Sequence, residues 1–145
     1  MKLTKIETPP RTRIDTTVGT RVFTGDTMIY GGTGWRDITE NLMYAASPGA
    51  RILIRRDNNL VTVSADVFQL TEEVPAYGDF LSIPEGFRTE RTFRQSGAYE
   101  AGAIYTSTGG LYISTRSAMT PGNRRFYIQY AANTNWPTSL PGTQA

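Results

Sequence analysis

Residues 50–65, ARILIRRDNNLVTVSA, carry two short apolar segments on either side of a polar turn. Segments 51–55 and 60–64 are rich in Ile, Leu and Val, which favour strands. The DNN between them tolerates the positive φ angles that a tight turn requires. In the second segment Val61 and Val63 alternate with polar residues, so one face of that strand is apolar. The stretch therefore predicts a β-hairpin.

The same alternation and the same turn residues recur along the chain. GAIYTSTGGLYIST (102–115) predicts a second hairpin around TGG, and RRFYIQYA (124–131) predicts a strand with apolar residues at every second position. Two strands are expected in 20–38, divided by a Gly-Asp turn, and two more in 79–93, divided by a Pro-Glu-Gly turn. These strands follow one another at the spacing of about 8–12 residues that is typical of β-sandwiches and barrels.

Helices are only weakly predicted, because 14 glycines and eight prolines interrupt the sequence. The best helical candidate is ITENLMYAA (38–46), with Thr39 as a possible N-cap. We therefore expect an all-β, antiparallel fold. Residues 1–22 contain TPPRTR and few apolar positions, so we expect them to form an extended N-terminal arm ahead of a compact domain at 23–145.

The side chains available for chemistry are few. Cys and His are absent, which excludes a disulfide framework, a thiolate nucleophile, Cys-type zinc sites and histidine-based triads. The carboxylates are scattered over predicted turns, so we expect no enzyme activity and no cofactor. Asp57, Asn58 and Asn59 lack the spacing of a calcium loop, and we expect no metal.

The overall charge and hydropathy limit the possible partners. A net charge of +2 provides no strong field for nucleic acid. No apolar stretch approaches the roughly 20 residues that a membrane-spanning helix needs. We expect neither nucleic-acid binding nor membrane insertion.

The end of the chain has an unusual composition. Residues 126–145 contain no Asp, Glu, Lys or Arg, but they include tryptophan, leucine and two prolines. Burying apolar surface is favoured by about 25 cal/mol per Å², so we expect this end to pack down, either on its own chain or on a neighbouring copy. The residues expected at an interface between copies are Trp35, Phe126, Tyr130, Trp136 and Leu140.

Three tyrosines are predicted to lie opposite the aliphatic residues of their own strands. They are Tyr105, Tyr112 and Tyr127. Tyrosines in such positions suit a sugar-binding surface, a subunit interface or burial on both faces of a sheet, and the sequence leaves these three interpretations open.

Several stretches together resemble a known family. GDTMIYGGTGWRDI, ILIRRDNNLVTVS, IPEGF, GLYIST and YIQYAANTNWPTSLPG are similar in style to the C-terminal region of minor tail and tail-fibre proteins from phages of actinobacteria. The likeness runs from about Gly25 to Gly142, and TGWRDI and WPTSLPG are its most specific elements. It implies a virion protein with a β-sandwich or jelly-roll-like head, usually a homotrimer, that engages host cell-wall polysaccharide.

Two positions within a virion stay open, on the tail or on the capsid surface. In the first, the chain is a tail or tail-fibre protein that contacts other virion proteins through its arm. In the second, it is a capsid decoration protein, of the head-fibre or cement type, whose arm binds the capsid lattice. A polysaccharide depolymerase, which would need converging carboxylates in a groove between subunits, is a third alternative. The arm residues expected to make the attachment are Lys2, Lys5, Arg11 and Arg13.

Turn position and side-chain chemistry suggest which residues would contact a polysaccharide. Three weak sites on one rigid trimer would bind far more tightly than a single site. The expected contacts are Asp57, Asn58, Asn59, Tyr99, Glu100, Tyr105, Tyr112 and Arg116.

Overall fold

The computed structural model describes residues 11–95 and 103–145. Within these ranges the strands pair antiparallel and form two sheets, and the helical elements are two short 3₁₀ turns, η1 (Thr39–Asn41) and η3 (Thr108–Gly110). The prediction of an all-β fold built from antiparallel sheets is confirmed.

The larger sheet runs in the order β1-β2-β3-β5-β4-β12, and β6 and β11 extend it on the other side of β5. Its strands are β1 (Thr12–Asp15), β2 (Thr20–Thr24), β3 (Thr27–Gly32), β4 (Arg36–Asp37), β5 (Ile52–Asp57), β6 (Leu60–Leu70), β11 (Gly122–Ala131) and β12 (Thr143–Gln144). The smaller sheet runs in the order β7-β10-β9-β8. Its strands are β7 (Asp79–Ser82), β8 (Arg94–Gln95), β9 (Ile104–Thr106) and β10 (Tyr112–Thr115).

The predicted hairpin is formed by β5 and β6, with Ile54 opposite Val63. Asn58 in its turn has a φ of 54°, in the left-handed region that Asn tolerates better than most residues. Its side-chain oxygen accepts a hydrogen bond from the backbone N–H of Gly31 at 2.8 Å. The turn therefore also fixes the end of β3 against the hairpin.

The hydrophobic core lies between the two sheets. Phe126 of β11 packs edge-to-face against Phe68 of β6, with ring centroids 5.7 Å apart, and against Phe80 of β7, with centroids 5.4 Å apart. Aliphatic residues of both sheets join the same buried cluster, Val63 from β6 and Ile113 from β10 among them. The predicted alternation along β11 is confirmed, because Phe126, Ile128 and Tyr130 are buried and the residues between them are exposed.

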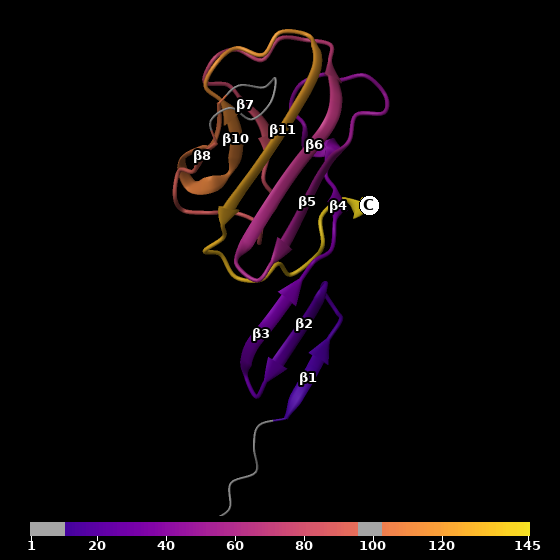
Figure 1. The fold of residues 1–145 in the computed structure, drawn as a ribbon, viewed down its shortest axis with the longest axis vertical. Helices are drawn as coiled ribbons and strands as arrows, with labels where there is room; N and C mark the ends of the chain where they lie inside the picture. The colour runs from indigo at the N-terminus through magenta and orange to yellow at the C-terminus, as the bar shows by residue number, and fades with distance from the viewer. Residues whose placement is uncertain (1–10, 96–102) are drawn as a thin grey trace, which may run out of the picture.

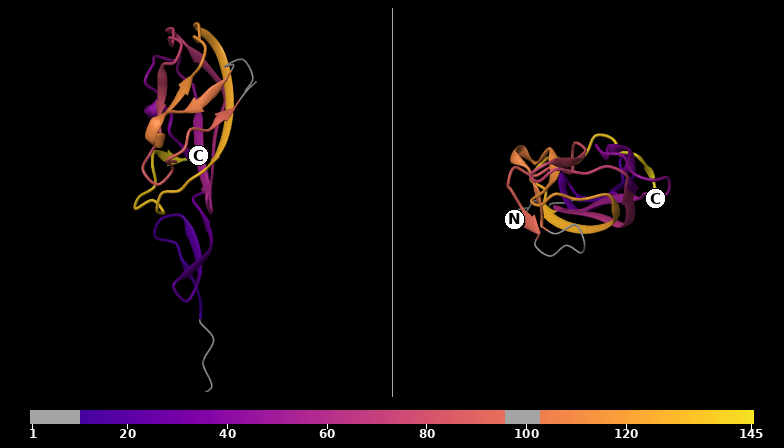
Figure 2. Two further views of the ribbon diagram at one scale, coloured as in Figure 1. Left: turned by 90° about the vertical axis from the view of Figure 1, so that its left-hand side faces the viewer. Right: turned by 90° about the horizontal axis from the view of Figure 1, so that it is seen from above.

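The first three strands form a meander that projects from the rest of the molecule along its longest axis (Figures 1 and 2). We call the remaining strands and their loops, from residue 33 onward, the head. The meander joins the head through one ladder position, Gly32 opposite Asp57, and through the loop contacts beside it. The expected boundary between residues 22 and 23 falls inside β2. Residues 12–22 thus supply β1 and part of β2 to this projection.

The best helical candidate, residues 38–46, forms only the single turn η1. Thr39 does not cap a helix; its hydroxyl donates to the Asp37 carboxylate at 2.6 Å and accepts from the backbone N–H of Ile52 at 2.9 Å. Beyond the turn, Leu42 and Ala46 make isolated bridges to strands of the two sheets. These contacts hold the segment extended.

The second strand expected in 79–93 is also absent from the described residues, because β7 ends at Ser82 and residues 83–93 run as turns and loop. Side chains satisfy the carbonyls of this loop in place of a ladder. Arg56 donates to Gly86 O at 2.5 Å, the Tyr130 hydroxyl donates to Phe87 O at 2.7 Å, and the Thr134 hydroxyl donates to Arg88 O at 3.2 Å.

Candidate functional site

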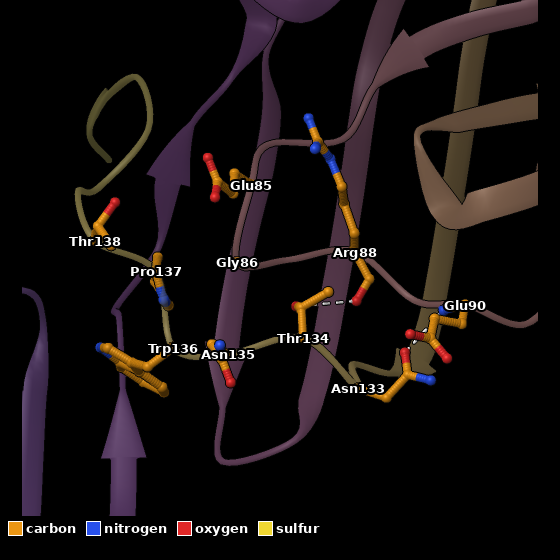
Figure 3. A pocket seen from close by; sticks show the side chains of 10 residues that line it. All are labelled: Glu85, Gly86, Arg88, Glu90, Asn133, Thr134, Asn135, Trp136, Pro137 and Thr138. Carbon is orange, nitrogen blue, oxygen red and sulfur yellow. Dashed lines mark hydrogen bonds between the residues drawn. The ribbon is translucent and has the colours of Figure 1, made fainter.

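A groove of about 440 Å³ opens where the C-terminal segment, residues 133–145, runs past the loop at 85–90 (Figure 3). The groove lies at the end of the head nearest the meander. It is lined by Glu85, Gly86, Arg88, Glu90, Asn133, Thr134, Asn135, Trp136, Pro137 and Thr138. Two segments that are far apart in the sequence therefore build its walls.

Arg56 of β5 holds the two walls together from behind. Only 2% of the residue is exposed, and its guanidinium donates to carbonyls of three different segments. Nε reaches Asn58 O at 2.8 Å, Nη1 reaches Gly86 O at 2.5 Å and Asn135 O at 2.9 Å, and Nη2 reaches Thr134 O at 3.0 Å. Burial lowers the pKa of Arg56 below its usual value, and the carbonyl oxygens compensate the buried charge.

Trp136 closes the groove on the side of the meander. Its indole ring lies 5.3 Å from the Arg56 guanidinium, and its Nε1 donates to Val18 O at 2.9 Å. The ring passes so close to Gly31 of β3 that a Cβ there would lie 2.7 Å from it. Trp136 therefore ties the meander, the hairpin and the C-terminal segment to one another.

The opposite wall is equally constrained. A Cβ on Gly86, whose φ is +83°, would lie 2.5 Å from Pro137, so this position requires glycine for both its conformation and its contact. Arg88 Nε donates to Ile83 O at 2.9 Å. Burial raises the pKa of the Tyr130 phenol, which stays protonated and donates to the loop. The groove is consequently set on a rigid frame.

The groups that face the groove are polar and of mixed charge. Glu85, Glu90, Asn133 and Asn135 are exposed, and Arg88 is half-buried beside them. Asn133 uses its side-chain oxygen to accept the Glu90 N–H at 2.8 Å, which leaves its amide nitrogen directed away from that bond (Figure 3). Carboxylates, an amide and a guanidinium in one concave surface can bind a ligand that offers many hydroxyl groups.

Of the residues expected to contact polysaccharide, those in the hairpin turn serve the fold. Asp57 forms an ion pair with Arg55 at 3.2 Å, and Asn58 bonds Gly31 as described above. Asn59 is exposed, and its carbonyl accepts from the Ala132 N–H at 2.6 Å. Tyr99 and Glu100 lie outside the described residues.

Tyr105 and Tyr112 are brought together on the outer face of the smaller sheet. Tyr105 lies opposite Ser114, and Tyr112 lies two positions before Ser114 on the same strand, so the tyrosines are diagonal neighbours. Both are half-buried, and Arg116 is exposed just beyond β10. This face is on a different sheet from the hairpin turn, so the expected contacts that the structure describes fall in two separate places.

Two of the residues expected at an interface between copies need correction. Phe126 and Tyr130 are 1% and 2% exposed because they belong to the core of their own chain, so a partner cannot reach them. Trp35, Trp136 and Leu140 are half-buried. The C-terminal segment lies against its own chain: Arg36 donates to the carbonyls of Pro141 and Gly142, and β12 pairs with β4.

The expected attachment residues fall at the start of the chain. Lys2 and Lys5 lie outside the described residues. Arg11 is exposed, and its carbonyl accepts from the Gly25 N–H at 3.2 Å. Arg13 is exposed as well, and its guanidinium stacks 4.1 Å from the Phe23 ring centroid.

Sequence reasoning missed both the groove and Arg56. The signal for Arg56 was present, because positions 52, 54 and 56 of an alternating strand share one face and the first two are Ile. An arginine on an apolar face needs buried acceptors. The groove offered no comparable signal, since Glu85, Arg88 and Glu90 look like ordinary charges of an exposed turn.

Comparison with protein-family models, with curated proteins and with solved structures finds no match to this chain. Among residues 11–95 and 103–145, no group of three or more Asp and Glu side chains is placed to hold a metal ion. No helix in these same ranges has the length and apolar character needed to cross a bilayer.

Proposed function

We propose that this chain is a phage virion structural protein of the minor tail or tail-fibre type, and that its head binds host cell-wall polysaccharide. The head would be a jelly-roll-like β-sandwich, with the chain before it serving as the attachment arm. The groove between the 85–90 loop and the C-terminal segment carries this proposal. It is a concave, preorganised surface on a chain without histidine or cysteine, which favours binding over catalysis.

The chemistry of the groove suits a carbohydrate. Sugar hydroxyls both donate and accept, so they are recognised by planar groups such as carboxylates, amides and guanidinium, which Glu85, Asn135 and Arg88 supply. A volume of about 440 Å³ lies within the range of small-molecule sites, roughly 300–1,000 Å³. The frame around Arg56 limits the entropy that the walls would lose when a ligand binds.

A homotrimer would present three such grooves on one particle component. Each groove is open and polar, which predicts weak binding of a single sugar unit, and simultaneous engagement of a repeating polymer would raise the apparent affinity strongly. The motifs that resemble tail-fibre proteins, TGWRDI and WPTSLPG, contribute Trp35 near the chain end and Trp136 at the groove. The resembling motif WPTSLPG therefore supplies part of the groove itself.

The test is capture of the purified chain on immobilised host-wall polysaccharide and on a glycan array. We expect saturable binding to at least one polymer and competition by that polymer in solution. Failure to bind any wall polymer, with the chain folded and multivalent, would overturn the receptor part of the proposal. The copy number in purified virions decides the location: a number that matches the capsid lattice would replace the tail assignment with capsid decoration.

A further inference from the structure

The two faces of the β1–β3 meander differ sharply in charge. The strand register places one row of residues, Ile14, Val22 and Tyr30, directly opposite one another on the same face. Alternation along the strands adds threonines to that row. We call this the uncharged face, and it consists of Thr12, Ile14, Thr20, Val22, Thr24 and Tyr30.

The opposite face of the meander holds its charged side chains, which contact one another and the Phe23 ring. Arg21 forms an ion pair with Asp15 at 3.1 Å, and the guanidinium groups of Arg13 and Arg21 lie 4.1 Å and 5.3 Å from the Phe23 ring centroid. Trp136 covers the same face at Gly31. This side of the meander is therefore already packed, and it keeps a net positive charge because two arginines share it with one aspartate.

The uncharged face has no such cover from the described residues. Ile14 is 68% exposed and Tyr30 is 45% exposed. A three-stranded sheet needs a packed apolar face to be stable, and a row of exposed apolar side chains on a sheet marks a contact surface.

We propose that the uncharged faces of three copies of this chain pack against one another around the axis of the homotrimer. The charge distribution selects this occupant, because two uncharged faces meet without bringing like charges together, and the hydroxyls at the rim can bond across the contact. The meander projects along the longest axis, so copies can meet there beside their heads (Figures 1 and 2). This inference rests on the homotrimer of the proposed function and names its surface.

The first experiment measures self-association of the full chain by sedimentation equilibrium over a range of concentrations. Ile14→Glu places a charge in the middle of the uncharged face, and we expect the dissociation constant for self-association to rise at least about tenfold. Met43→Glu is the matched control, since Met43 is a 50% exposed apolar residue of the head, and we expect less than about a twofold change. Thermal unfolding of each variant verifies that it folds.

A second experiment stays informative even where Ile14→Glu does not fold. The chain has no cysteine, so single cysteines can report on each face. With a short bis-maleimide, Ile14→Cys should give covalent oligomers, and Arg13→Cys, one residue away on the opposite face, should give few. This interface is overturned if cross-linking is equal at both positions, or if Ile14→Glu leaves the oligomer intact. Neither result contradicts the homotrimer. A wild-type chain that stays monomeric overturns both the interface and the homotrimer. Polysaccharide binding by the groove is tested separately, by its own binding assay.

Discussion

The Arg56 guanidinium lies 5.3 Å from the centroid of the Trp136 ring, and both groups are held by backbone carbonyls of distant segments. Arg56 comes from the central hairpin and Trp136 from the C-terminal segment. Their contact explains how an uncharged end of the chain is fixed in place. It lies directly behind the groove, so the shape of the candidate site depends on a pair of residues that a ligand need not touch.

Replacing Arg56 should be strongly destabilising. Arg56→Met removes four hydrogen bonds and leaves the carbonyls of Gly86, Thr134 and Asn135 without this donor, and we expect a loss of about 2–4 kcal/mol in the free energy of unfolding. Urea unfolding measures this loss. Arg55→Met is the control: it removes a half-exposed ion pair with Asp57, and it should cost less than about 1 kcal/mol. Equal losses for the two variants would show that Arg56 does not organise the fold.

Gly31→Ala tests the contact between the meander and Trp136. Alanine in place of glycine ordinarily stabilises by about 0.4–1 kcal/mol where the backbone permits it. Here a Cβ would lie 2.7 Å from the Trp136 ring, so we expect a destabilisation of about 1–3 kcal/mol instead.

The double variant Gly31→Ala with Trp136→Leu tests whether the indole ring causes this loss of stability. Once the indole is removed, Gly31→Ala should cost less than about 0.5 kcal/mol or become favourable. A cost that is the same with and without the indole would assign the effect to the strand itself and contradict a direct contact.

Asp37 should contribute to stability that is lost in acid. Burial opposes ionisation of Asp37, but hydrogen bonds from Thr39 and the charge of Arg51 outweigh it, so the pKa lies below its usual 3.8. A lowered pKa in the folded state stabilises the protein above the unfolded pKa, and this contribution disappears as the pH falls through the folded pKa. Asp37→Asn should therefore be less stable than wild type at about pH 6, and the difference should shrink by about pH 3. A difference in stability between Asp37→Asn and wild type that stays constant over this pH range would mean that ionisation of Asp37 does not contribute to stability.

The sequence predicted the parts of the fold that depend on local alternation. The β5–β6 hairpin and the buried face of β11 follow from apolar residues at every second position, because each strand has one face on the core. Residues 79–93 were harder, since carbonyls that look available for a ladder are bound by Arg56, Tyr130 and Thr134 from other parts of the chain.

Sequence patterns did not predict the candidate site. Its walls come from two segments more than forty residues apart, and both follow irregular paths. Phe126 and Tyr130 illustrate the opposite difficulty. Their aromatic character fits an interface as well as a core, and only the position of the smaller sheet decides between the two.

Binding of wall polysaccharide to groove variants tests the central claim most directly. The measurement compares equilibrium affinities of wild type, the double variant Glu85→Gln with Asn135→Ala, and the control Glu73→Gln, whose exposed carboxylate lies outside the groove. We expect the double variant to lose about tenfold or more in affinity, and the control to match wild type. Equal binding by all three proteins would contradict a polysaccharide site in this groove.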